Sequence, residues 1–92
     1  MKLQASAAAG SENKSDVLVT VAPADSLTVT LLAKPIILRQ FGPQIEETVR
    51  QAAAQEGVEG AAIQVKDGGG ALDFTIRARV RCALRRAKGE DG

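Results

Sequence analysis

The stretch Val17-Leu18-Val19-Thr20-Val21 decides the expected fold of this chain. The three valines would share one face of an extended backbone, while Leu18 and Thr20 would occupy the other. A period of two in a run rich in β-branched residues predicts a strand over about residues 16–22.

A second strand is expected directly after the first. Pro23-Ala24-Asp25-Ser26 is typical turn chemistry, and the following run alternates leucine and valine with threonine. We therefore predict a strand over about 27–33, paired with the first strand as a β-hairpin.

The middle of the chain changes to helical periodicity. Pro35 permits a short helical turn, and Gly42-Pro43 breaks that pattern and starts a longer helix over about 43–56, because proline is tolerated at the first helical position. Four apolar residues form its stripe: Ile45, Val49, Ala52 and Ala53. Gly57 is expected to cap this helix.

The C-terminal third contains an ambiguous segment. Ile63 and Val65 predict a strand over about 61–66, and Asp67-Gly68-Gly69-Gly70 predicts a reversal. Residues 72–80 alternate strictly, as in a strand, but the apolar residues also recur every fourth position towards Leu84, as in a helix. We choose a strand over about 71–78 that runs into a helix over about 79–88, because the Ala, Leu and Arg content favours helix there.

Composition limits the class of protein. The chain has 92 residues, a formal net charge of +1, no His, and one cysteine, Cys82. This size predicts one small domain, and the strand and helix patterns predict an α+β fold. We expect a flexible segment at 1–15, the domain at 16–88 and a frayed tail at 89–92. We expect a cytoplasmic protein, since the start lacks a long apolar signal stretch, no segment approaches about 18 apolar residues, and a lone cysteine fits a reducing compartment.

The polar segment Ala9–Asp16 contains the most informative chemistry. It places the hydroxyls of Ser11 and Ser15 just ahead of the first strong strand, whereas the rest of the chain offers no recognisable pair of nucleophile and base. A small domain with an exposed hydroxyl and few catalytic side chains is more typical of a carrier than of an enzyme.

Three pieces of the chain carry a recognisable combination. They are Ala9-Gly10-Ser11 with Ser15-Asp16-Val17, then Gln40-Phe41-Gly42 with Gln44-Ile45, then Gly70-Ala71-Leu72-Asp73 with Arg77-Ala78-Arg79-Val80. Taken together, in this order and spacing and over roughly residues 8–88, they resemble the acyl carrier subunit (gamma chain) of bacterial citrate lyase.

The resemblance implies a non-catalytic carrier whose serine bears 2'-(5''-phosphoribosyl)-3'-dephospho-CoA through a phosphodiester. The thiol of this arm would hold acetyl and citryl thioesters during cleavage of citrate to acetate and oxaloacetate. The implied partners are the citrate lyase alpha and beta chains, a prosthetic-group transferase and an acetate-ligating activation enzyme, without nucleic acid or membrane. A malonate decarboxylase-type carrier is the related alternative.

The chain departs from the family at the modified position. The family usually has its modified serine two positions before the Asp, where this chain has Lys14, whose amine cannot form the phosphodiester. Ser15 is the nearest hydroxyl and our expected attachment site. Ser11, Ser26 in the Asp-Ser-Leu sequence, and an unmodified carrier remain alternatives.

Half of the twelve basic residues lie near the C-terminus, with no acid between 74 and 89. We expect Arg77, Arg79 and Arg81 to share one strand face and to dock partner chains or the phosphates of the arm. The alternatives are a solvated face, or a small nucleic-acid-binding domain. The second is weakened by the near-neutral charge and by the presence of only two aromatic residues.

Overall fold

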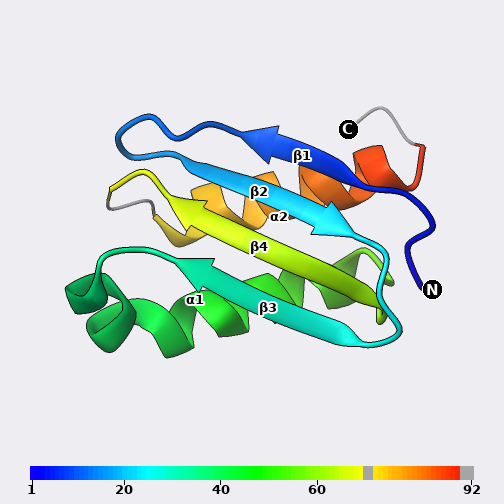
Figure 1. Cartoon of the computed structure of the whole chain (residues 1–92), viewed down its shortest axis with the longest axis horizontal. Coiled ribbons are helices and arrows are strands. Elements are labelled where there is room, and N and C mark those ends of the chain that lie inside the picture. Colours follow the sequence, from blue (N-terminus) through cyan, green and yellow to red (C-terminus); the bar gives the residue numbers. More distant parts are fainter. Residues whose placement is uncertain (70–71, 90–92) are drawn as a thin grey trace.

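The alternating valines lie at the centre of a sheet. The computed structural model describes residues 1–69 and 72–89. Within these ranges it contains β1 (Ala7–Gly10), β2 (Val17–Ala22), β3 (Leu27–Leu32), α1 (Pro35–Gln55), β4 (Ala61–Asp67) and α2 (Asp73–Ala87). Both helices cover the same face of the sheet, so the expected small α+β domain is confirmed (Figure 1).

The core lies between that face and the helices. The inward residues of β2 and β4 are almost fully buried because their alternation points every second side chain at the helices: Val17, Val19, Val21, Ala61, Ile63 and Val65. The outward positions of the sheet include the exposed Thr20, Thr28 and Gln64. In the described residues, no helix is long and apolar enough to cross a membrane.

The strands near 17 and 27 are present, but the predicted hairpin between them is wrong. The sheet order is β1-β2-β4-β3, so β4 separates β2 from β3. β4 runs antiparallel to β2, with Val19 opposite Val65, and parallel to β3, with Val29 opposite Ile63. Parallel neighbours require a long crossover, and α1 supplies it. Alternation within a strand does not specify its neighbour.

β1 lies within the segment to which the sequence analysis assigned no regular structure. It pairs antiparallel with β2, with Ala9 opposite Val19, and Ala9 is buried. Leu3 is also buried, and its backbone N–H donates to Gly60 O at 2.8 Å. Alanine has a low strand propensity, so this strand forms through its tertiary contacts, and its sequence carries little signal.

The expected helix break at Gly42-Pro43 is also wrong. α1 is one helix from Pro35 to Gln55, with Pro43 inside it and Gly42 buried. Pro43 removes one backbone donor, but the buried stripe that follows it, with Ile45 and Val49, keeps the helix on the sheet, and the half-buried Ile37 packs against the core before it. The cap at Gly57 is confirmed: its φ is +69°, and the amides of Gly57 and Val58 donate to Ala54 O and Ala53 O, as in a Schellman motif.

The segment predicted as a strand over 71–78 belongs to α2 where the structure describes it. Ile76, Val80 and Leu84 are buried at four-residue spacing, whereas Phe74 is 70% exposed. The alternating pattern was therefore fortuitous, and the competing helical pattern determined the structure. Gly70 and Ala71 lie outside the described residues, as does most of the predicted tail, residues 90–92.

Candidate functional site

The β1–β2 connection forms a tight turn at one end of the sheet (Figure 1). The amide of Asp16 donates to Asn13 O at 3.0 Å, which closes a four-residue turn with Lys14 and Ser15 at its corners. Ser15 has a φ of +68°. It is the only non-glycine residue with a positive φ among the described residues. A positive φ at the second corner is the requirement of a type II turn, which glycine or asparagine usually meets.

The turn is attached to the connection between β4 and α2. The Ser15 amide donates to Gly69 O at 3.2 Å, and the Gly68 amide donates to Asp16 O at 2.9 Å. A Cβ on Gly68 would come within 2.1 Å of Asn13 O, so glycine is required there. The turn therefore packs closely on the neighbouring loop.

Asp16 is the centre of the polar contacts around this turn. Arg79 donates to both of its carboxylate oxygens, with Nε at 3.1 Å and an Nη at 3.2 Å. The Ser11 hydroxyl donates at 2.8 Å, and so does the backbone amide of Val17. The hydrogen bonds from Arg79, then Ser11, then Val17 lower the pKa of Asp16 from 3.8 to about 2, so Asp16 is ionised at neutral pH and is a weak base.

The two candidate serines differ in the availability of their hydroxyls. Ser11 is half-buried, and its Oγ donates to Asp16 and accepts the Asn13 amide at 3.3 Å. Ser15 is exposed, and among the described residues its hydroxyl has no hydrogen-bond partner. Lys14 beside it is exposed as well. Ser26 is exposed immediately before β3, where its carbonyl accepts the Ala61 amide at 3.3 Å. An exposed hydroxyl at a turn corner fits covalent attachment of a group.

The expected row of arginines on one strand face is wrong, because these residues lie on α2. Helical geometry places Arg77 and Arg81 on one side and Arg79 on another. Arg79 pairs with Asp16, Arg81 donates to Glu56 at 2.8 Å, and Arg77 donates to the exposed Gln51 at 3.1 Å. Asp16 and Glu56, two acidic residues distant in the sequence, thus neutralise Arg79 and Arg81.

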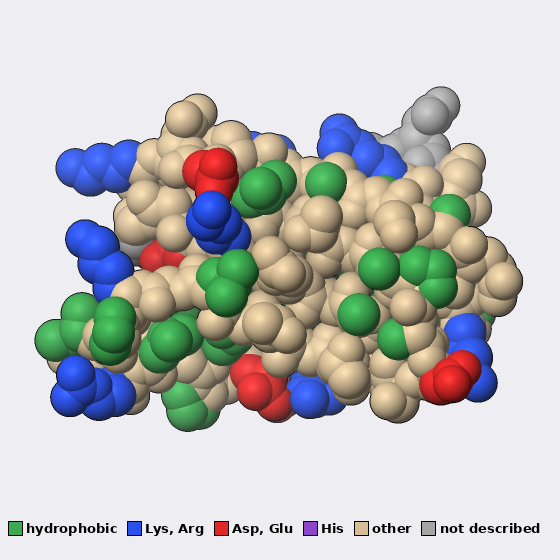
Figure 2. All heavy atoms as spheres, viewed as in Figure 1, with side chains coloured by type: hydrophobic (Ala, Val, Ile, Leu, Met, Phe, Trp, Pro, Cys, Tyr) green, Lys and Arg blue, Asp and Glu red, His purple; other side chains and the backbone are tan. Residues whose placement is uncertain are grey.

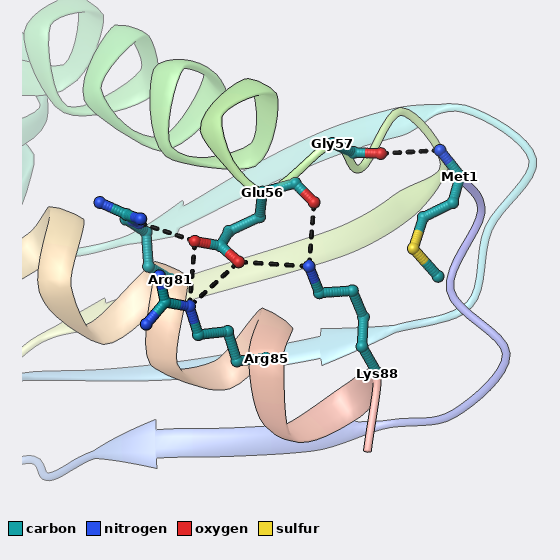
Figure 3. A network of polar contacts seen from close by, with 6 residues as sticks. All are labelled: Met1, Glu56, Gly57, Arg81, Arg85 and Lys88. Carbon is teal, nitrogen blue, oxygen red and sulfur yellow. Dashed lines mark hydrogen bonds and ion pairs between the residues drawn. The ribbon is translucent and has the colours of Figure 1, made fainter. Parts of the chain in front are cut away.

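Glu56, which the sequence analysis did not single out, joins the ends of the two helices (Figure 3). Its carboxylate is 5% exposed and accepts hydrogen bonds from Arg81, Arg85 and Lys88. Burial raises the pKa of Glu56, but these three donors outweigh it and lower the pKa from 4.5 to about 2. The partners are 25 to 32 residues away, so no local pattern could have identified them.

A pocket of about 300 Å³ opens between α1 and the start of α2. Its lining is mainly apolar: Ile37, Phe41, Gln44, Ile45, Asp67, Leu72 and Asp73. The Gln44 side-chain amide donates to Asp73 at 2.5 Å. Hydrophobic side chains also gather on the surface over the N-terminal part of α1 (Figure 2), where Ile36 and Phe41 are exposed.

The three sequence pieces that carry the resemblance meet in the structure. The Arg79–Asp16 pair joins the first piece to the third. The Gln44–Asp73 hydrogen bond joins the second to the third. These two contacts link pieces that lie far apart in the sequence.

Comparison with known proteins agrees with this pattern. The family model described as malonate decarboxylase delta subunit (MdcD) matches residues 4–87. The citrate lyase acyl carrier protein of Haemophilus influenzae strain Rd is 43% identical over 90 residues, which are 98% of this chain and 92% of that protein. That of Pectobacterium carotovorum strain PC1 is 44% identical over 87 residues, covering 95% of this chain and 88% of the relative. The Streptococcus mutans protein of the same name is 38% identical over 87 residues, covering 95% and 84%. The chain therefore belongs to the citrate lyase acyl carrier protein family, whose members are carrier subunits and not enzymes.

Proposed function

We propose that this protein is the acyl carrier subunit of a citrate lyase, with the prosthetic arm attached to Ser15. The observation that carries the proposal is the exposed Ser15 hydroxyl at the corner of a closed turn, in a chain of this family. Covalent attachment needs an accessible hydroxyl, and the contacts of Ser11 make its hydroxyl less available than that of Ser15.

The residues around Ser15 fit a large anionic group outside the domain. The serine projects from the end of the sheet, and Lys14 beside it provides a positive charge for the phosphates of an incoming donor. When bound, 2'-(5''-phosphoribosyl)-3'-dephospho-CoA would supply a thiol on a long arm, which carries acetyl and citryl groups between two active sites. Asp16 is ionised and hydrogen-bonded, so we assign it to holding the turn and not to activating the serine.

The partners would be the alpha and beta chains of citrate lyase, a prosthetic-group transferase and an acetate-ligating activation enzyme, all in the cytoplasm. Of the three arginines predicted to dock partners, we assign Arg77 to docking. It lies beside the exposed Phe74 on α2 and donates to the uncharged Gln51, whereas Arg79 and Arg81 pair with acidic residues. Charge reversal at Arg77 should weaken binding to the purified alpha or beta chain without changing the thermal unfolding temperature. Unchanged binding at moderate salt would exclude this docking face.

The function can be tested by reconstitution. The carrier is modified by the transferase of a citrate lyase system and combined with alpha and beta chains, and citrate cleavage is measured. Ser15→Ala should abolish cleavage, whereas Ser11→Ala should retain it. Cleavage by the Ser15→Ala protein would exclude Ser15 as the attachment site.

A malonate decarboxylase-type carrier is the second candidate, because the family model that matches residues 4–87 has that description. It uses a similarly modified serine and would differ in its partner chains. Activity of the modified protein with malonate decarboxylase subunits, and none with citrate lyase chains, would favour this candidate. The nucleic-acid alternative depended on a basic face, and Arg79 and Arg81 instead pair with Asp16 and Glu56.

A further inference from the structure

Arg79 makes a contact that surface docking does not explain. Its guanidinium spans both carboxylate oxygens of Asp16, at 3.1 Å and 3.2 Å, across 63 positions of sequence. A two-point contact of this kind fixes orientation as well as distance, because the guanidinium is planar and rigid. Arg79 therefore connects the middle of α2 to the turn between β1 and β2.

The stem of Arg79 also fits closely against β1. A Cβ placed on Gly10 would lie 3.2 Å from Arg79 Cδ and 1.9 Å from Val17 O. Gly10 has a φ of +92°, a conformation that glycine adopts without strain. The Arg79 side chain thus passes close to Gly10, the last residue of β1, before its guanidinium reaches Asp16 at the end of the turn.

Ser15 needs such support to keep its conformation. A serine at a φ of +68° is in the left-handed region, which non-glycine residues leave unless surrounding contacts hold them. Two backbone hydrogen bonds involve Asp16 directly: its amide donates to Asn13 O and its carbonyl accepts the Gly68 amide. Movement of Asp16 would therefore disturb both and release Ser15.

We infer that Arg79 is a positioning residue for the modification of Ser15, which it serves by holding Asp16 and thereby the turn that presents the serine hydroxyl. This inference rests on the proposed function, since it assumes that a group is attached at Ser15. The inference gives Asp16, the residue after Ser15, a structural role in holding the turn. The Asp16 carboxylate accepts four hydrogen bonds: two from Arg79 of α2, one from the Val17 amide of β2, and one from the hydroxyl of Ser11.

The test compares Arg79→Gln with Arg50→Gln, a matched variant whose arginine pairs with Glu46 on α1 and does not contact the turn. Solvent-exchange rates of the Asp16 and Gly68 amides are measured by NMR. The rate of arm attachment is measured by intact mass with a citrate lyase prosthetic-group transferase, and kcat and KM are determined separately. Arg79→Gln should raise both exchange rates at least tenfold and lower kcat/KM at least tenfold, while Arg50→Gln changes each less than twofold. Arg79→Lys, which keeps the charge, should recover part of the loss.

The outcomes are separable. Exchange rates in Arg79→Gln equal to wild type would overturn the inference, whatever the transferase does. Faster exchange with unchanged kcat/KM would show that the turn is held but that holding it does not serve modification, which also overturns it. If wild type itself accepts no arm, the proposed function fails, while the exchange rates still report on the turn. Should Arg79→Gln fail to fold, Ser11→Ala, which removes one hydrogen bond from Asp16, should show the same changes at smaller size.

Discussion

Replacing Glu56 with glutamine should destabilise the fold through the loss of one buried charge. The substitution keeps the shape of the side chain and the end of α1 but removes the negative charge that faces Arg81, Arg85 and Lys88. A carboxyl whose pKa falls from 4.5 to about 2 on folding contributes at most about 3 kcal/mol at neutral pH, since each pKa unit is worth a little over 1 kcal/mol.

The expected loss is smaller because solvent screens part of the attraction. The side chains of Arg81 and Arg85 are 37% and 41% exposed, so we expect Glu56→Gln to lower the free energy of unfolding by about 1–2 kcal/mol at pH 7. For a chain of 92 residues, this corresponds to a decrease in Tm of roughly 4–16 °C. Glu59→Gln is the matched control, because Glu59 is an exposed partner of the Met1 amine, and its change should stay below about 0.5 kcal/mol.

The difference between wild type and Glu56→Gln should also depend on pH. The pKa of Glu56 is lower in the folded state than in the unfolded state, so its contribution is present above pH 4.5 and is lost as the pH falls towards 2. Roughly half should remain near pH 3. Urea unfolding of both proteins at several pH values measures this. A difference under about 0.5 kcal/mol at pH 7, or one of equal size at pH 7 and pH 3, would refute the reasoning.

Five further substitutions test the fold by thermal or urea unfolding. Gly10→Ala should lower the free energy of unfolding by more than about 2 kcal/mol, because the new Cβ would clash with Val17 O. Gly57→Ala should lower it by only about 1 kcal/mol, because Gly57 has a φ of +69° but open space around it. Equal losses would contradict the close approach at Gly10. Pro43→Ala should stabilise the protein by about 1–2 kcal/mol by restoring a helical donor inside α1, and a lower Tm would show that the proline supports the helix. Ile76→Ala should lower the free energy of unfolding by about 2–4 kcal/mol, and Phe74→Ser by less than about 0.5 kcal/mol. Large losses for both substitutions would indicate that both side chains are buried, as they would be on one face of a strand.

Local patterns predicted the elements whose signals are local. The strands at Val17 and Leu27, the strand at Ile63, and the cap at Gly57 follow from alternation and turn chemistry, and the structure confirms them. The strand order could not be predicted in this way, because β4 fits between β2 and β3 only once α1 has crossed over.

The errors at Pro43 and at residues 72–78 have a common physical cause. Local propensity favours a break at a proline and extended structure in an alternating run, but packing on the sheet outweighs both preferences. Ile76, Val80 and Leu84 bury one helical stripe, and the exposure of Phe74 costs less than leaving that stripe unburied.

The turn with the candidate serines stands out in the sequence, but its contacts could not be predicted. The serines near Asp16 stood out because the chain contains little other chemistry. The pairing of Asp16 with Arg79 and of Glu56 with Arg81 joins residues that only the fold brings together. The arginine-rich segment therefore suggested an open basic face, although Arg79 and Arg81 form ion pairs with acidic residues of the same chain.

The most direct test of the central claim is peptide mapping by mass spectrometry of the protein isolated from its native host. The account predicts an intact mass increased by one phosphoribosyl-dephospho-CoA group and an adduct confined to the peptide bearing Ser15. An unmodified chain in cells that are cleaving citrate would contradict the carrier function. An adduct on Ser11 or Ser26 would contradict the assignment of Ser15.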